Sequence, residues 1–205
     1  MGNRDYLIYA VHTAFWWAFV ITRLVLKARS RREPGTREPD DRAPATDDRS
    51  RTAPHSRALL AFHSVAFVMM YFGLAYAILP NRVPGWFAGQ RLAGTLVILA
   101  GAALTSWTLI HFESWRFRAA LDEHHVLATG GPFRFVRHPI YLGLTLLALG
   151  SAIWVPTAIV WIGAVLMAIG SDLRGRAEER LLADAFGAAY RDYCSATSRF
   201  IPGIY

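Results

Sequence analysis

The sequence is poor in cysteine, in lysine and in charge. Cys194 is the only cysteine among 205 residues, which excludes an intrachain disulfide and any cysteine-cluster zinc or iron–sulfur site. Lys27 stands alone beside 21 arginines, a skew that is typical of GC-rich coding and favours a bacterial source. Only 18% of the residues are charged and 54% are hydrophobic. These averages hide a strong segregation of charge, and charge-free stretches of about 20 residues exclude an ordinary soluble domain.

The few charges are concentrated in one segment. Residues 29–57 hold eight Arg and six Asp or Glu, together with Pro34, Pro39, Pro44 and Pro54. This composition predicts a disordered linker. No nucleic-acid motif accompanies the net charge of +7, so we expect no nucleic-acid partner and interpret the basic excess as cytoplasmic flanks of membrane spans.

Long apolar runs dominate the rest of the chain. They are Tyr6–Leu26, Ala58–Leu79, Leu92–Ile110 and Ile140–Ser171. Each of the first three is long enough to cross a ~30 Å hydrocarbon core as a helix. The first run is longer than the apolar region of a signal peptide, and no small-residue cleavage site follows it. We therefore expect a retained span.

The last run holds 32 residues without a charge and has Pro156 at its middle. It is either one kinked helix or a hairpin of two helices of about 16 residues. Two glycine pairs spaced by seven allow close packing of each half: Gly143 with Gly150, and Gly163 with Gly170. The hairpin is favoured, because a single span would place the polar segments before and after it on opposite sides of the membrane.

The sequence thus predicts an all-α polytopic membrane bundle of about five transmembrane helices with a C-terminal helical hairpin. The arginine-rich loops place the N-terminus outside and the C-terminus in the cytoplasm of a multi-pass protein. The expected parts are residues 1–28 (first span), 29–57 (linker), 58–112 (second and third spans) and 113–205 (a core containing the hairpin and a C-terminal cytoplasmic helix).

Two polar segments flank the hairpin, and the hairpin must bring them together. They read HHVLATGGPFRFVRHPIY over 124–141 and RGRAEERLLADAFGAAYRDY over 174–193. Taken singly, each feature has a structural explanation. His138 suits a helix cap, Tyr141 an interfacial anchor, and Arg174 with Glu178, four residues apart, a solvated salt-bridged helix.

The combination is more specific. It comprises Arg137-His138-Pro139-Ile140-Tyr141-Leu142-Gly143, then Arg174 with Glu178-Glu179, Phe186-Gly187, Tyr190, Tyr193 and Phe200-Ile201-Pro202. This pattern resembles the isoprenylcysteine carboxyl methyltransferase and phospholipid methyltransferase superfamily of membrane enzymes. The resemblance covers Glu123 to Pro202, about 80 residues, and does not include the first three spans.

The resemblance implies S-adenosyl-L-methionine as cofactor and a lipophilic acceptor. The implied cofactor-binding residues are His125, Val126, Leu127, Ala128, Phe133, His138, Pro139, Tyr141 and Glu178. Glu178 would hold the amino-acid end of the cofactor, and Arg174 would face the acceptor in the catalytic role. Phe133 stands where a cofactor-contacting tyrosine is typical.

These residue types suit transfer of a methyl group from a sulfonium. The donor is already activated, so the protein mainly supplies position and exclusion of water. An acceptor carboxylate needs orientation but no base, and the planar fork of an arginine provides it. Arg174 therefore favours an oxyanion acceptor, and the resemblance implies that this acceptor is an isoprenylcysteine-like carboxylate. A lipid amine is the alternative, with His138 or Glu179 as its base.

Three other functions stay open on the sequence alone. A metal oxygenase would use clustered histidines, but His111, His124, His125 and His138 lack the usual spacings, so no metal is expected. A sterol-reductase-like, NADPH-dependent membrane reductase need not carry a glycine-rich fingerprint. A non-catalytic bundle or small transporter would rely on ionisable residues within the spans, for which Arg23, His12 and His63 qualify.

Overall fold

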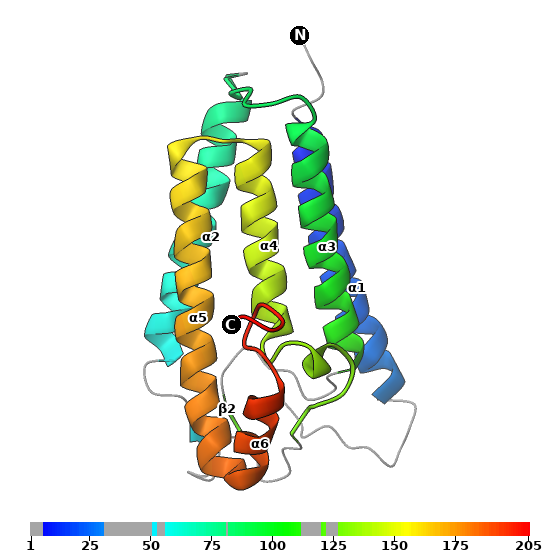
Figure 1. Ribbon diagram of the computed structural model, residues 1–205. Helices are drawn as coiled ribbons and strands as arrows, with labels where there is room; N and C mark the ends of the chain where they lie inside the picture. Colours follow the sequence, from blue (N-terminus) through cyan, green and yellow to red (C-terminus); the bar gives the residue numbers. More distant parts are fainter. Residues whose placement is uncertain (1–5, 31–50, 53–55, 81, 112–119, 122–126) are drawn as a thin grey trace.

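The computed structural model describes residues 6–30, 51–52, 56–80, 82–111, 120–121 and 127–205. Helices account for most of this part of the chain (Figure 1). They are α1 (Leu7–Ser30), α2 (Ser56–Ile78), α3 (Gln90–His111), the 3-10 helix η1 (Gly131–Arg134), α4 (Pro139–Trp154), α5 (Ala158–Phe186) and α6 (Ala188–Ala196). One antiparallel pair joins two-residue strands, β1 (Arg51–Thr52) and β2 (Ala120–Leu121).

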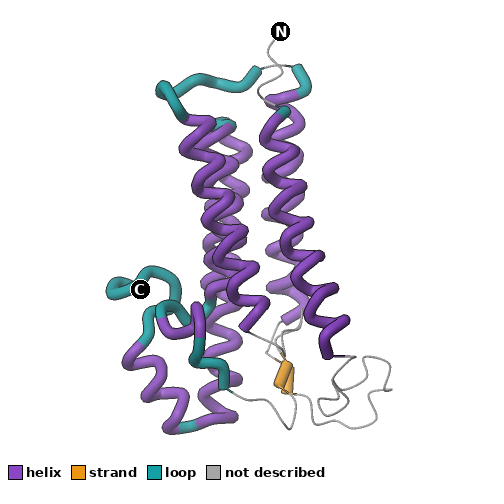
Figure 2. The backbone as a smooth tube through the Cα atoms, turned by 90° about the vertical axis from the view of Figure 1, so that its right-hand side faces the viewer, coloured by secondary structure: helices purple, strands orange, loops and turns teal. Residues whose placement is uncertain are grey.

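The five long helices run up and down beside one another (Figures 1 and 2). Helix α4 lies at the centre, between α3 and α5, while α2 packs on α5 and α1 packs on α3. Large apolar side chains fill the interior where these helices meet; Phe15, Met70, Ile98, Leu147 and Trp154 are almost inaccessible to solvent. The predicted all-α bundle is confirmed.

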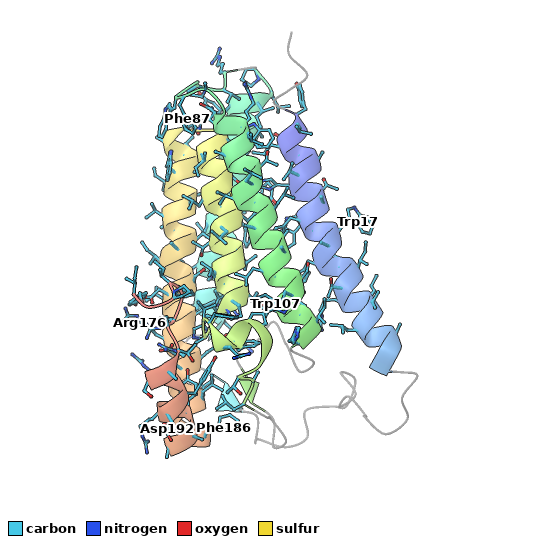
Figure 3. The ribbon with its side chains drawn as sticks, turned by 45° about the vertical axis from the view of Figure 1, so that its right-hand side comes forward. Trp17, Phe87, Trp107, Arg176, Phe186 and Asp192 are labelled. Atoms are coloured by element: carbon cyan, nitrogen blue, oxygen red, sulfur yellow. The ribbon has the colours of Figure 1, made fainter. Side chains whose placement is uncertain are left out.

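The outward faces of the bundle are apolar too. Trp17, Val68, Phe72, Leu92 and Leu96 are each more than half exposed, and Trp17 points away from α1 in Figure 3. Exposed apolar area on this scale is matched by lipid rather than water. Helices α1, α2, α3 and α5 are each long and apolar enough to cross a membrane, and α4 is a shorter apolar helix beside them.

The last apolar run forms the predicted hairpin and not one kinked helix. Helix α4 ends at Trp154 and α5 begins at Ala158, so Pro156 lies in the turn between them. The two helices have unequal lengths, 16 and 29 residues. Because α5 is longer, its C-terminal part extends beyond the start of α4 and lies beside α6 (Figure 1).

Glycines set the spacing of α4 and α5 from their neighbours. A Cβ added at Gly150 would lie 2.7 Å from the carbonyl oxygen of Gly94, and one added at Gly101 would lie 2.7 Å from that of Gly143. The glycines of α5 also permit a close contact, because a Cβ added at Gly163 would lie 3.0 Å from the backbone nitrogen of Met70 in α2. The spacing of seven residues between glycines therefore allows the predicted close packing of helices, because it places small residues on the contact face.

The polar segments gather at one end of the bundle. Here α3 ends and α4 begins, and η1 and α6 pack beneath them (Figures 1 and 2). The labelled charged residues Arg176 and Asp192 lie toward this end, whereas Phe87 lies at the other (Figure 3). Most of the predicted linker, residues 31–50 and 53–55, falls outside the described residues, so its disorder stays a prediction.

Candidate functional site

Four of the predicted site residues meet where α4 begins. The Tyr141 hydroxyl donates a hydrogen bond to Oε1 of Glu178. The guanidinium carbon of Arg174 lies 5.1 Å from the centroid of the Tyr141 ring. The His138 ring also stacks on the Tyr141 ring, at 5.8 Å between centroids. Residues 37 apart in sequence thus form one cluster, which we call the Tyr141 cluster: His138, Tyr141, Arg174 and Glu178.

Local sequence explains how these side chains meet. Pro139 occupies the first turn of α4, where its missing N–H removes no helical hydrogen bond. Arg174 and Glu178 are four residues apart on α5 and share a face. Gly175 lies between them, and a Cβ there would approach the His138 ring to 3.1 Å. The lack of a side chain at this position therefore lets His138 pack directly against α5.

Both glutamates of α5 face His138. Its Nδ1 lies 3.6 Å from Oε2 of Glu178, and its Nε2 lies 3.3 Å from Oε1 of Glu179. Burial lowers the pKa of His138, but the hydrogen bonds and charges of the two carboxylates outweigh burial and raise the pKa above its ordinary value. The imidazolium form is therefore favoured, and it bridges the adjacent acids.

The two glutamates are otherwise unlike. Glu179 accepts hydrogen bonds from two arginines, Arg137 (Nε to Oε1, 2.8 Å) and Arg199 (Nη2 to Oε2, 2.6 Å). Its side chain is 14% exposed, against 25% for Glu178. Glu179 therefore faces the arginines of the segments before α4 and after α6. Glu178 thus keeps more room for a ligand than Glu179.

Sequence reasoning missed the role of the segment after α6. Arg199 of this segment binds Asp172 (Nη1 to Oδ1, 3.2 Å) as well as Glu179. Tyr205 adds a hydrogen bond to the same carboxylate oxygen, 2.8 Å long. The signal in the sequence was the seven-residue spacing of Asp172 and Glu179, which places both acids on one face of α5.

The remaining implied cofactor residues lie nearby or outside the described part. Leu127 and Ala128 are half-buried in the segment before η1. Phe133 lies within η1, and its carbonyl accepts a 2.7 Å hydrogen bond from the Tyr193 hydroxyl of α6. His125 and Val126 fall outside the described residues.

A polar path leads from the Tyr141 cluster into the bundle. The ring of His63 in α2 lies 5.9 Å from that of Tyr141. Its Nε2 lies 3.3 Å from the Ser171 hydroxyl, which in turn receives a 3.1 Å hydrogen bond from Thr145. His63, which the sequence offered as an ionisable residue within a span, makes an interhelical contact and also borders the candidate site.

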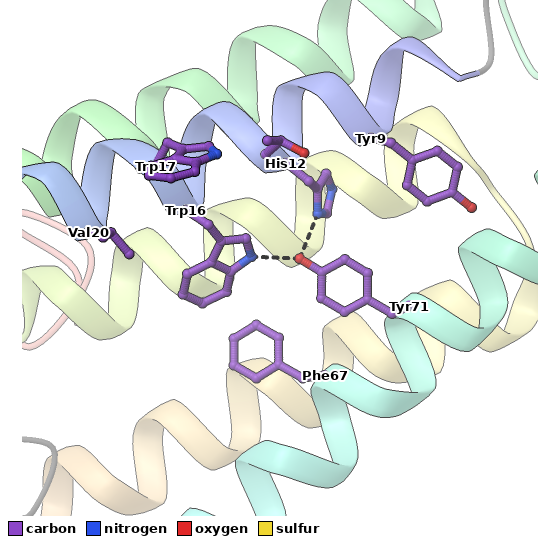
Figure 4. A pocket seen from close by; sticks show the side chains of 8 residues that line it. Tyr9, His12, Trp16, Trp17, Val20, Phe67 and Tyr71 are labelled. Carbon is purple, nitrogen blue, oxygen red and sulfur yellow. Dashed lines mark hydrogen bonds between the residues drawn. The ribbon is translucent and has the colours of Figure 1, made fainter.

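A second polar group lies nearer the other end, beside a pocket of about 570 Å³ between α1 and α2 (Figure 4). Trp16 donates a 2.7 Å hydrogen bond to the Tyr71 hydroxyl, which bonds Nδ1 of His12 at 3.0 Å. The other ring nitrogen of His12 bonds Ser151 of α4 at 2.9 Å. We call these four residues the His12 cluster. All of its hydrogen-bonding partners are neutral.

The Tyr141 cluster offers complementary groups for a zwitterionic ligand. It has a half-buried carboxylate, an aromatic face and a guanidinium within one site. Carboxylates bind ammonium groups and aromatic faces attract cations, while arginine binds carboxylates. Within the residues that the structure describes, no group of three His, Cys, Asp or Glu side chains could hold a metal ion.

Comparison with known proteins supports the motif-based interpretation. The family model described as phospholipid methyltransferase matches residues 90–189. The match includes α3, which the motif-based resemblance left out, and so extends that resemblance toward the N-terminus. Protein-S-isoprenylcysteine O-methyltransferase A of Arabidopsis thaliana is 28% identical over 118 residues, 57% of this chain and 55% of the relative.

Two further relatives carry the same kind of name. The B form from Arabidopsis thaliana is 28% identical over 135 residues, 65% of this chain and 59% of the relative. Protein-S-isoprenylcysteine O-methyltransferase of Dictyostelium discoideum is 32% identical over 85 residues, 40% of this chain and 35% of the relative. The chain thus spans little more than half the length of the Arabidopsis proteins.

Proposed function

From the similarity of residues 90–189 to the phospholipid methyltransferase family and of this chain to isoprenylcysteine O-methyltransferases, we propose a specific reaction. The chain is a membrane methyltransferase. Its methyl donor is S-adenosyl-L-methionine, and its acceptor is a lipophilic molecule that carries a carboxylate. The observation that carries the proposal is that Arg174 lies against the Tyr141 ring while Glu178 accepts the hydrogen bond of the Tyr141 hydroxyl.

The residues present fit this donor. S-Adenosyl-L-methionine supplies a methyl group on a sulfonium, beside an amino-acid end with an ammonium. Glu178 receives one hydrogen bond from Tyr141 at Oε1, and Oε2 lies 3.6 Å from His138, so the carboxylate retains acceptor capacity. A quarter of its side chain is exposed. Glu178 would bind the ammonium.

The other implied residues have supporting roles. Tyr141 holds the carboxylate of Glu178 in place, and His138 supports both. Leu127, Ala128, Phe133 and the backbone around Pro139 would line the rest of the cofactor site, and His125 and Val126 belong to the same proposal. Arg174 would orient the acceptor carboxylate, because a guanidinium binds both oxygens of such a group at once.

The acceptor proposal follows from the charge of Arg174. A carboxylate is attracted to a guanidinium and needs no proton removed before it accepts a methyl group. An amine would be repelled in its protonated form and would need a base. The names of the relatives favour the carboxylate, as an isoprenylcysteine-like group. The description of the family model favours the alternative, a phospholipid amine.

The location of the site suits both substrates. A polar donor arrives from water and a lipid-linked acceptor from the bilayer. The Tyr141 cluster lies where the hairpin opens toward the polar end of the bundle, and arginine-rich loops favour the cytoplasm on that side. We therefore place the site at the inner membrane surface, with the N-terminus outside.

Methyl transfer from radiolabelled donor tests the acceptor class. The purified protein in detergent would be assayed separately with three acceptors: S-farnesylcysteine, the carboxamide of S-farnesylcysteine, and phosphatidylethanolamine. We expect labelled product only from the free carboxylate, and alkali should release the label as methanol because the product is an ester. Label on phosphatidylethanolamine that resists alkali would establish the amine alternative. NADPH binding without methyl transfer would instead support the reductase.

A further inference from the structure

The nine residues after α6 return to the start of α4. We call residues 197–205 the returning segment. The Arg137 N–H donates to the carbonyl of Ser198 (2.9 Å), and the His138 N–H donates to that of Arg199 (3.3 Å). The Phe200 ring lies 5.9 Å from the His138 ring. The returning segment therefore touches the residue on which Tyr141 stacks.

Glu179 joins the returning segment to two other parts of the chain. Its carboxylate lies on α5 and binds Arg199 through both oxygens, at 3.0 and 2.6 Å. It also binds Arg137 of the segment before α4. The Arg137 guanidinium in turn donates to the carbonyls of Cys194 and Thr197. One carboxylate thus connects α5, the start of α4 and the end of α6.

A second acid holds the far end of the segment. Asp172 lies two turns before Glu179 on the same face of α5 and contacts Arg199 and Tyr205. Between the two acids lies Gly175, against which His138 packs. The returning segment therefore covers the face of α5 that adjoins His138, while Arg174 and Glu178 lie toward Tyr141.

The two neighbouring glutamates thus differ in the groups that they bind. The oxygens of Glu179 receive three hydrogen bonds from two guanidinium groups, and the residue is mostly buried. An arginine-bound carboxylate with this many donors has little capacity for a further ligand. Removing one member of such a partly buried ion pair leaves the partners without compensation.

We propose that Glu179 is a positioning residue for the donor site. It fixes the returning segment through Arg199 and Arg137, so that His138 and Phe200 form one wall of that site, and it does not itself bind the donor. This proposal rests on the proposed function, because it assigns a wall of the same site. It assigns different roles to two adjacent acids: Glu178 binds the methyl donor, and Glu179 positions the returning segment.

The test compares hydrogen exchange of the returning segment with binding of S-adenosylhomocysteine in full-length variants. Glu179→Gln keeps the size of the side chain and removes its charge. We expect faster amide exchange over residues 197–205 and roughly tenfold weaker binding, the scale of one lost charge-assisted hydrogen bond. Asp184→Asn, a charge loss on an exposed position of the same helix, should change neither quantity.

Arg199→Lys provides a second test in case the Glu179→Gln protein does not fold. It keeps the positive charge but loses the fork that reaches Glu179 and Asp172 together. It should reproduce both effects in weaker form. The loss in the double variant Glu179→Gln/Arg199→Gln should be smaller than the sum of the losses in Glu179→Gln and Arg199→Gln, because the two residues share one contact while Arg199 also binds Asp172.

The outcomes separate the proposal from the proposed function. Faster exchange with unchanged binding would overturn the assignment of the segment as a wall. Weaker binding with unchanged exchange would overturn it too, since Glu179 would then contact the donor directly. If the wild type binds no S-adenosylhomocysteine, the donor site itself is wrong. The exchange data would still show whether Glu179 holds the segment.

Discussion

Two polar clusters lie within this bundle, each built around a buried histidine. His12 is 3% exposed and bonds Tyr71 of α2. His138 is 6% exposed and stacks on Tyr141 of α4. Their partners differ. The His12 cluster links neutral side chains of α1, α2 and α4. The Tyr141 cluster places the imidazole between two carboxylates, with arginines beyond them.

This difference indicates that the His12 cluster is a contact between helices, whereas the Tyr141 cluster is a candidate ligand-binding site. In the His12 cluster the donors and acceptors satisfy one another. Trp16 donates to Tyr71, Tyr71 can donate to Nδ1 of His12, and Nε2 can then donate to Ser151, whose hydroxyl donates to the Leu147 carbonyl. Such a chain holds helices together in lipid. In the Tyr141 cluster Glu178 retains acceptor capacity and exposure.

The largest expected effect is on turnover. Arg174→Ala should lower the rate of methyl transfer by about 10²–10³-fold, since it removes the group that orients the acceptor. Binding of S-adenosylhomocysteine should stay near the wild-type value. Single-turnover assays with saturating donor measure the first quantity and calorimetric titration the second. Arg180→Ala, a charge loss at an exposed position of the same helix, is the control; equal activity of both variants would remove Arg174 from the site.

The next effect compares two tyrosines. Tyr141→Phe removes the hydroxyl that holds Glu178, so the dissociation constant of S-adenosylhomocysteine should rise about tenfold. Tyr71→Phe removes the corresponding hydroxyl of the His12 cluster and should leave that constant unchanged. Titration of both variants measures the contrast. If Tyr71→Phe lost more affinity for S-adenosylhomocysteine than Tyr141→Phe, the donor site would lie at the His12 cluster and not at the Tyr141 cluster.

A smaller effect concerns stability alone. His12→Leu breaks the contact between α1, α2 and α4, and interhelical hydrogen bonds in membrane proteins contribute about 0.6–2 kcal/mol. The thermal midpoint in detergent should fall by a few degrees, roughly 2–4 °C per kcal/mol for a chain of this size. Methyl transfer measured well below the midpoint should be normal. An inactive but stable His12→Leu protein would contradict a purely structural role.

The smallest effect is a pH dependence of stability. The pKa of His138 in the folded protein lies above its unfolded value of about 6.5. Its stabilising contribution is therefore complete below about pH 6.5 and is lost as the pH rises through the folded-state pKa. Thermal midpoints over about pH 5 to 8 should fall with rising pH more steeply in the wild type than in His138→Gln. Parallel curves would indicate that His138 does not titrate with folding.

The sequence was most informative where a single local rule applies. Uncharged runs predicted the spans, Pro156 predicted the hairpin turn, and glycines spaced by seven predicted the close helix contacts. The motif also named the members of the Tyr141 cluster. What it could not supply were the partners of Glu179, because Arg137 and Arg199 meet only after the chain has passed through the hairpin and α6.

The same limit applies to His63. On the sequence alone it is one buried histidine in an apolar run, and helical periodicity does not tell which helix it will face. Its place near Tyr141 depends on the packing of α2 against α5, at the height where Gly170 leaves room for the imidazole. Long-range packing of this kind is not encoded in any short motif.

Titration of the detergent-purified protein with S-adenosylhomocysteine, beside Glu178→Ala and an NADPH control, tests the central claim most directly. We predict saturable binding to the wild type, binding to Glu178→Ala that is weaker by about tenfold or more because the ammonium loses its charged partner, and no binding of NADPH. A folded wild-type protein that binds NADPH and not S-adenosylhomocysteine would contradict the account. Undiminished binding to Glu178→Ala would contradict the assigned site.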